Sequence, residues 1–122
     1  MTTETIEIDF AKMDGLVPAI VQDAKTLEVL MVGFLNETSY EKTLETGYVT
    51  FWSRTRRKLW MKGETSGNRL RVIDAATDCD QDAVVFRVEV EGDGLVCHEG
   101  TVSCFTRPIA VAAALRQDEV SA

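Results

Sequence analysis

The chain has 122 residues, the length of one ordinary domain, and 45% of them are hydrophobic, which is enough for a core and excludes a largely disordered protein. Twenty acidic against thirteen basic residues give a formal net charge of −7, which disfavours a general nucleic-acid coat protein. No stretch is as apolar and as long as a membrane span, and the N-terminus lacks the pattern of a signal peptide. We therefore expect a cytoplasmic protein that binds neither membranes nor nucleic acid.

The first half of the chain predicts a hairpin, a helix and a second pair of strands. Residues 16–21 and 27–32 are two apolar runs joined by a polar, turn-like segment, which is typical of a hairpin. Asn36 is a good N-cap, so a helix is expected over 37–46, with Gly47 ending it. Residues 48–52 and 58–62 are predicted strands, the first because it is rich in β-branched and aromatic side chains.

The second half predicts further strands and a terminal helix. Two glycines and small polar residues make 63–68 a loop. The segment 70–90 is mostly strand and is followed by a turn, whereas 108–119 is Ala-rich with Pro108 in its first turn, which favours a helix. The expected fold is α+β, a single domain over 1–122 with its core at about 16–105. It has a mainly antiparallel, strongly twisted sheet, one short helix and a C-terminal helix.

Charged residues are unevenly distributed along the chain. Residues 54–71 carry seven basic side chains and one acidic one, whereas the remainder holds six basic and nineteen acidic residues. Residues 72–86 contain four aspartates and no Lys or Arg. Charge runs of this kind are often solvated faces. The alternative is an anion site beside a cation site, as a phosphorylated substrate and a metal would require.

The segment 78–82, Asp-Cys-Asp-Gln-Asp, is the most informative short motif. In an extended strand, side chains alternate, so Asp78, Asp80 and Asp82 would share one face and Cys79 would lie on the other. Three carboxylates on one face suit a hard cation such as Mg²⁺ or Ca²⁺, whereas the thiolate suits a softer metal such as Zn²⁺. An exposed Asp-rich turn with an incidental cysteine is the alternative.

The cysteine count is odd, so Cys79, Cys97 and Cys104 cannot all form disulfides within one chain. Cysteine is often a small buried hydrophobe, but all three lie among polar, Gly or Asp residues. Cys97 and Cys104 are seven residues apart, which is not the spacing of a structural zinc ribbon. Three thiolates do match the ligand number of a catalytic zinc. Such a zinc keeps its fourth position for a water that ionises near neutral pH and becomes a nucleophile.

The single histidine, His98, directly follows Cys97. It is too close in sequence to be assumed a fourth ligand of the same metal. As a neutral base or proton shuttle beside a metal-activated water it is a candidate catalytic residue. A surface histidine is the alternative interpretation.

Four motifs occur together in this chain: WSRTR at 52–56, LWMKGETSGN at 59–68, DCDQD at 78–82 and CHEGTVSCF at 97–105. Each is weak alone, but the set resembles the phosphoribosyl-AMP cyclohydrolase family of histidine biosynthesis in order and spacing, over about residues 16–105. Two positions depart from the family pattern. Glu99 stands where Thr is usual after Cys-His, and Leu70 stands where Gln is common.

The resemblance implies an enzyme that hydrolyses the N1–C6 bond of the adenine ring of 1-(5-phosphoribosyl)-AMP, giving the formimino-aminoimidazole carboxamide ribonucleotide. It also implies an obligate, intertwined homodimer that shares one Zn²⁺ per subunit. Cys79 of one subunit and Cys97 with Cys104 of the other would hold that zinc. Mg²⁺ ligands of the family map onto Asp78, Asp80 and Asp82. Some relatives are fused to a phosphoribosyl-ATP pyrophosphohydrolase, and because this chain ends soon after Cys104 we expect it to be monofunctional.

The substrate implied by the resemblance carries two phosphates, which the basic segment 54–71 is expected to hold. Arginine forks and backbone N–H groups of a Gly-containing loop both bind phosphate. The candidate substrate-binding residues are Ser53, Arg54, Arg56, Lys62, Glu64, Thr65, Ser66 and Gly67, in a loop that ends at Asn68. Arg57 and Lys58 are expected to be solvated. Water would add to C6 while His98 relays a proton.

Two other functions fit parts of the pattern. A zinc hydrolase or deaminase acting on another purine nucleotide is disfavoured, because the H-x-E and P-C-x-x-C pair of that class is absent. A non-catalytic, zinc-containing binding module would use residues 54–71, with Trp52 and Trp60 stacking on bases. At strand positions, however, we expect these tryptophans to pack in the core.

Overall fold

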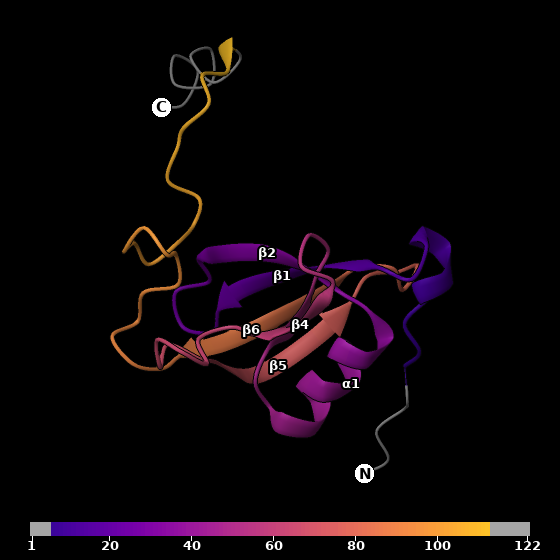
Figure 1. Ribbon diagram of the computed structural model, residues 1–122. Coiled ribbons are helices and arrows are strands. Elements are labelled where there is room, and N and C mark those ends of the chain that lie inside the picture. The colour runs from indigo at the N-terminus through magenta and orange to yellow at the C-terminus, as the bar shows by residue number, and fades with distance from the viewer. Residues whose placement is uncertain (1–5, 113–122) are drawn as a thin grey trace.

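A four-stranded sheet carries the fold in the computed structural model, which describes residues 6–112 (Figure 1). Its strands lie in the order β2-β1-β6-β5 and span Val29–Leu35, Val17–Asp23, Val84–Val90 and Leu70–Thr77. The pairs β1–β2 and β5–β6 are antiparallel, as expected, but β1 and β6 are parallel, so the sheet is mixed. In this parallel pair, β1 and β6 both begin at the same end of the sheet.

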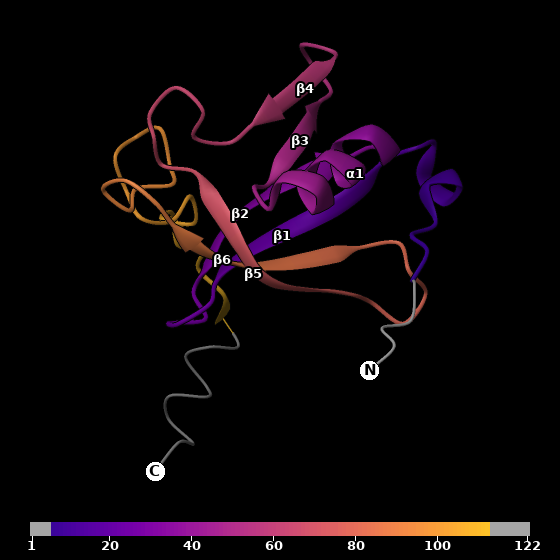
Figure 2. The same ribbon diagram turned by 90° about the horizontal axis from the view of Figure 1, so that it is seen from below.

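One face of this sheet is covered by a helix and a second, two-stranded sheet (Figure 2). The helix α1 spans Glu37–Thr46, and the small sheet pairs β3, Thr50–Ser53, with β4, Lys58–Met61. The side chain of Asn36 accepts a hydrogen bond from the Ser39 N–H at 2.8 Å, and the Ser39 hydroxyl accepts one from the Asn36 N–H at 3.0 Å. This capping box satisfies two N–H groups at the start of the helix. Both predicted ends of the helix are confirmed, since Gly47 follows in the left-handed region at φ 80°.

The core lies between the four-stranded sheet and this covering layer. Alternate residues of β1 and β6, such as Val17, Val21, Phe86 and Val88, are fully buried because successive side chains of a strand point to opposite faces. Phe51 of β3 is 1% exposed and completes the core from the covering layer.

A glycine lets the β3–β4 hairpin approach β2 closely. A Cβ atom added at Gly33 would lie 2.6 Å from two ring carbons of Phe51, nearer than such atoms can approach. Because Gly33 lacks this atom, the Phe51 ring packs directly on the β2 backbone. This contact positions the basic hairpin relative to the rest of the fold.

Three features differ from the sequence predictions. The acidic segment 78–82 is a turn joining β5 to β6, so its prediction as an extended strand is wrong. A short 3-10 helix, Phe10–Met13, was not anticipated. Residues 108–111 are irregular, and residues 113–119 of the predicted terminal helix lie outside the described residues.

Within residues 6–112, no helix is long and apolar enough to cross a membrane.

Gly33→Ala is expected to lower the free energy of unfolding by about 1–3 kcal/mol, because the added methyl group overlaps the buried Phe51 ring. Urea denaturation measures this change. In a Phe51→Leu background the same substitution should cost less, since the two side chains are coupled. An equal cost in both backgrounds would contradict the contact as its cause.

Candidate functional site

A cavity of about 540 Å³ lies where β4, the loop 62–68 and the segment 95–100 meet. The two loops lie side by side at one end of the sheet in both ribbon views (Figures 1 and 2). The cavity therefore brings together two sequence motifs that are some thirty residues apart. The predicted site residues on its lining are Arg56, Lys62, Glu64, Thr65, Ser66, Cys97 and His98.

The remaining predicted substrate residues lie outside this cavity. Ser53 borders a second hollow, of about 390 Å³, which Arg56 and Trp60 also line. The guanidinium of Arg54 stacks on the ring of Phe34, 4.0 Å from its centroid. Gly67 closes the loop through its N–H, which donates to the Gly63 carbonyl at 2.8 Å.

The cavity is lined by more basic than acidic side chains. Arg56, Lys58 and Lys62 face it against Glu64, so its field attracts anions. Lys58 is exposed, as expected, and it also borders the cavity. Trp60 was expected in the core, and that expectation is wrong, because Trp60 lines the cavity and is 37% exposed. The Lys62 ammonium lies 5.4 Å from the Trp60 ring centroid.

Cys97 lines this cavity, and the thiol of Cys104 lies beside that of Cys97. The Cys97 N–H donates to the Thr101 carbonyl at 3.0 Å, which closes a tight turn around Cys97. The Cys104 N–H donates to the Leu30 carbonyl at 2.8 Å, and the Ser103 hydroxyl donates to the Val29 carbonyl, also at 2.8 Å. The backbone of each cysteine is therefore fixed: Cys97 by the turn 97–101, and Cys104 by its hydrogen bond to β2.

The two thiols differ in how readily they ionise. The Glu99 N–H, aimed at the sulfur of Cys97, lowers the pKa of that thiol, and contact with Cys104 lowers it further. Burial raises the pKa of Cys104, and the neighbouring Cys97 adds to that rise. A pair in which one thiol ionises ahead of the other is suited to capturing a soft metal ion.

Cys79 lies at the opposite end of the sheet, in the exposed turn between β5 and β6. The seven residues of β6 separate that turn from the segment carrying Cys97, and a strand of this length spans roughly 23 Å. The three cysteines of a single chain therefore do not reach one ion. All three are free, and none is buried, which disfavours their interpretation as small core hydrophobes.

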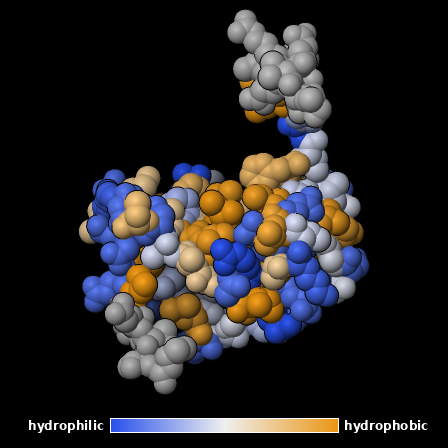
Figure 3. Space-filling view, turned by 180° about the vertical axis from the view of Figure 1, so that it is seen from behind, coloured by the Kyte–Doolittle hydropathy of each residue, from blue (hydrophilic) through white to orange (hydrophobic). Residues whose placement is uncertain are grey.

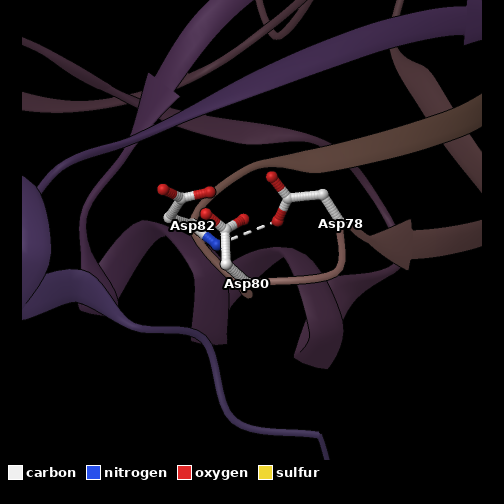
Figure 4. Close-up of side chains that lie close together, drawn as sticks. All are labelled: Asp78, Asp80 and Asp82. Carbon is white, nitrogen blue, oxygen red and sulfur yellow. Dashed lines mark hydrogen bonds between the residues drawn. The ribbon is translucent and has the colours of Figure 1, made fainter.

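The three aspartates of the acidic turn converge, although not by strand alternation (Figure 4). One carboxylate oxygen from each of Asp78, Asp80 and Asp82 lies within 4.8 Å of the others. The Asp78 carboxylate accepts hydrogen bonds from the N–H groups of Asp82 at 2.9 Å and Ala83 at 3.1 Å. The turn thus folds around Asp78 and brings the other two carboxylates toward it.

Lys12, which no sequence motif singled out, offsets part of the negative charge of this acidic turn. Its ammonium lies 2.9 Å from Asp80 and 3.2 Å from Asp82. The Lys12 ammonium holds the pKa of Asp80 at about 2, whereas the carboxyls of Asp78 and Asp80 raise the pKa of Asp82. No sequence signal pointed to Lys12, because the tertiary fold alone brings it to residues almost seventy positions away.

Comparison with known proteins gives a consistent family assignment. The model of the family described as phosphoribosyl-AMP cyclohydrolase matches residues 31–106. The chain is 58% identical over 102 residues to the phosphoribosyl-AMP cyclohydrolase of Solibacter usitatus, covering 84% of this chain and 80% of that protein. It is 56% identical over 100 residues to the enzyme of the same name from Desulfatibacillum aliphaticivorans, covering 82% and 79% of the two chains.

A longer relative is the histidine biosynthesis bifunctional protein HisIE of Bacteroides thetaiotaomicron, 53% identical over 100 residues. The match covers 82% of this chain and 48% of that protein, so this chain spans about half of the bifunctional relative. These similarities define an enzyme of the cyclohydrolase class. The chain belongs to the phosphoribosyl-AMP cyclohydrolase family, which confirms the prediction made from the four motifs.

Asp78→Ala is expected to lower the free energy of unfolding of the metal-free protein by about 1 kcal/mol, because two backbone N–H groups lose their acceptor. Asp78→Asn keeps an acceptor oxygen at the same position and should cost less. Denaturant titration with a chelator present measures both. If the two variants were equally destabilised, the turn would not depend on these hydrogen bonds.

Proposed function

We propose that this chain hydrolyses the N1–C6 bond of the adenine ring of phosphoribosyl-AMP, in histidine biosynthesis. The observation that carries the proposal is the cavity in which the basic loop meets Cys97 and His98, in a chain of this family. Several relatives bear the name of this activity, and the bifunctional relatives are named for histidine biosynthesis.

The basic side of the cavity supplies the binding site for a phosphorylated purine. Arg56 and Lys62 reach it from β4 and its flanking turns, and the hydroxyls of Thr65 and Ser66 lie on the same lining. Guanidinium and ammonium groups donate charge-assisted hydrogen bonds to phosphate oxygens. Trp60 presents an exposed aromatic face on which a purine can stack. Arg54 is proposed to contribute through its charge from its place on Phe34.

The thiols fit a zinc ion by their chemistry. Cys97 and Cys104 are adjacent, neither is buried, and the pKa of Cys97 is lowered whereas that of Cys104 is raised. Thiolates are preferred zinc ligands. We propose Cys79 of a second subunit as the third ligand. When bound, zinc supplies Lewis-acid activation of a water molecule that attacks C6.

His98 is proposed to move the proton in this reaction. It lines the cavity directly beside Cys97, where a ring nitrogen can accept a proton from the attacking water and return it toward N1 of the substrate. A C6–O bond forms and the N1–C6 bond breaks, so the overall change is the addition of one water. The substrate ring opens without release of ammonia.

We propose a homodimer because Cys79 lies too far from Cys97 and Cys104 within one chain to share a metal ion with them. The face of the sheet away from α1 is open and carries a row of apolar side chains in register across the four strands: Val32, Ile20, Val85 and Ala76. Figure 3 shows hydrophobic residues gathered on this side of the molecule. A two-fold axis in the plane of this face and perpendicular to the strands would set the strands of the two copies antiparallel. It would bring the Cys79 end of each chain toward the Cys97–Cys104 end of the other.

The activity itself is tested with an ultraviolet assay on phosphoribosyl-AMP, run with and without a chelator. The expected result is ring opening that the chelator abolishes and added zinc restores. Ammonia release in the same reaction would contradict the cyclohydrolase and favour a deaminase.

Shared zinc ligation is tested by mixing inactive variants. Cys79→Ser and Cys97→Ser chains should each lack activity and zinc. When they are unfolded, mixed in equal amounts and refolded, about a quarter of both should return, because a mixed dimer contains one intact site.

The matched control mixes Cys97→Ser with Cys104→Ser chains. Both substitutions remove a ligand from the subunit that supplies two thiols to each proposed site. No mixed dimer then has an intact site, and neither activity nor zinc should return. Recovery in this control, or none in the first mixture, would refute the shared site.

The acidic turn fits a magnesium ion, since three carboxylate oxygens already converge there. We propose Asp78, Asp80 and Asp82 as its ligands, with the ion organising the β5–β6 turn that also carries Cys79. Lys12 contacts two of the same carboxylates, so its ammonium and a divalent cation compete for them.

Lys12→Met is therefore expected to tighten Mg²⁺ or Mn²⁺ binding about two- to fivefold, the range of an exposed ion pair. Calorimetric titration of the metal-free protein measures this affinity. Lys25→Met, at an exposed turn remote from the aspartates, serves as the control for the loss of one positive charge. Weaker binding by the Lys12 variant would mean that the lysine supports the ion and does not compete with it.

A further inference from the structure

Asn68 connects the two loops that form the cavity. It ends the loop 63–68, and its side chain reaches the turn after β6, which leads into Cys97. Val96, between that turn and Cys97, is 2% exposed and packs in the core. A side chain that fixes this turn therefore also fixes where the chain leaves the core toward Cys97 and His98.

The carboxamide of Asn68 matches its two partners. Its oxygen accepts a hydrogen bond from the Asp93 N–H at 3.1 Å, and its nitrogen donates one to the Leu95 carbonyl at 3.0 Å. One acceptor and one donor on the same short side chain are required for this pair, and among side chains of this length only asparagine carries both.

Two glycines allow this contact to be close. A Cβ atom at Gly92 would lie 2.0 Å from the Asn68 side-chain oxygen, and one at Gly63 would lie 2.2 Å from the Asn68 carbonyl. Both glycines have positive φ angles, of 70° and 83°, which other residues adopt only with strain. Asn68 is thus enclosed by backbone on two sides.

We propose that Asn68 is a positioning residue for the reaction, holding the phosphate-side loop at a fixed distance from Cys97 and His98. This role rests on the proposed function, and it differs from that of a phosphate ligand because both polar atoms of the side chain are engaged by protein backbone. The substrate joins the two sides of the cavity, so their separation sets where its C6 atom lies relative to the reacting groups.

The kinetic constants distinguish the two roles. Loss of a phosphate ligand raises KM and leaves kcat unchanged, whereas a misplaced reacting centre lowers kcat. Asn68→Ala is expected to lower kcat about 10- to 100-fold, the effect of a misplacement of the order of 1 Å. Asn68→Asp keeps the volume and the acceptor but opposes a carboxylate oxygen to the Leu95 carbonyl, so it should lower kcat as well.

Gly92→Ala tests the same contact from its other side. The added methyl group displaces the Asn68 side chain, and its effect on kcat should not add to that of Asn68→Ala in the double variant. Thr46→Ala is the matched control, because Thr46 also bonds backbone through one polar group but lies at the end of α1. It should lower the melting temperature with kcat unchanged.

An unchanged kcat in both Asn68 variants, or fully additive effects with Gly92→Ala, would overturn the proposal. A wild-type protein that does not open phosphoribosyl-AMP would refute the proposed function instead. In that case the positioning contact is judged by amide hydrogen exchange at Asp93, which should be faster in Asn68→Ala than in the wild type. Equal exchange rates in the two proteins would overturn it.

Discussion

The length of β6 is the constraint on which the proposed site depends. This strand lies inside the sheet, paired on both sides, and joins the acidic turn at one end to the thiol-bearing segment at the other. Its buried residues pack in the core, so it cannot shorten or bend to bring the two ends together. The aspartates and Cys79 are thus kept apart from Cys97 and Cys104 within one chain. In the proposed dimer the same rigidity becomes useful, because it sets the distance between the two shared sites.

The cavity depends on two close approaches that glycine makes possible. Gly33 admits the Phe51 ring, which seats the basic hairpin on β2, and Gly92 admits Asn68, which ties the neighbouring loop to the turn before Cys97. The first contact joins β3 to β2, and the second joins the loop 63–68 to the turn that follows β6. A surface assembled from three separate connections can hold its shape only if each is fixed to the rigid part of the fold.

Local chemistry explains which elements were predictable from sequence. The helix over 37–46 was found with its ends because Asn36 and Gly47 act on their own neighbours. The acidic segment was misassigned because alternation of Asp residues looks the same in a strand and in a turn, and the hydrogen bonds to Asp78 decide between them. The parallel pairing of β1 with β6 had no sequence signal, since it joins segments more than sixty residues apart.

In the candidate site, too, features set by local sequence were predictable and features set by tertiary contacts were not. Motifs located the thiols, His98 and the basic loop. The place of Lys58 beside the cavity, the contact of Lys12 with the aspartates and the hydrogen bonds of Asn68 arise from tertiary packing. Patterns of residue type identify which chemistry is present. They do not show which of several similar charges faces a cavity.

The open apolar face of the sheet has a consequence for how the protein is made. A newly folded single chain exposes this face, and apolar surfaces of this kind also attract unrelated or partly folded chains. If the protein is the proposed dimer, dimerisation and aggregation of the folded monomer compete. The yield of soluble dimer therefore depends on the protein concentration during synthesis.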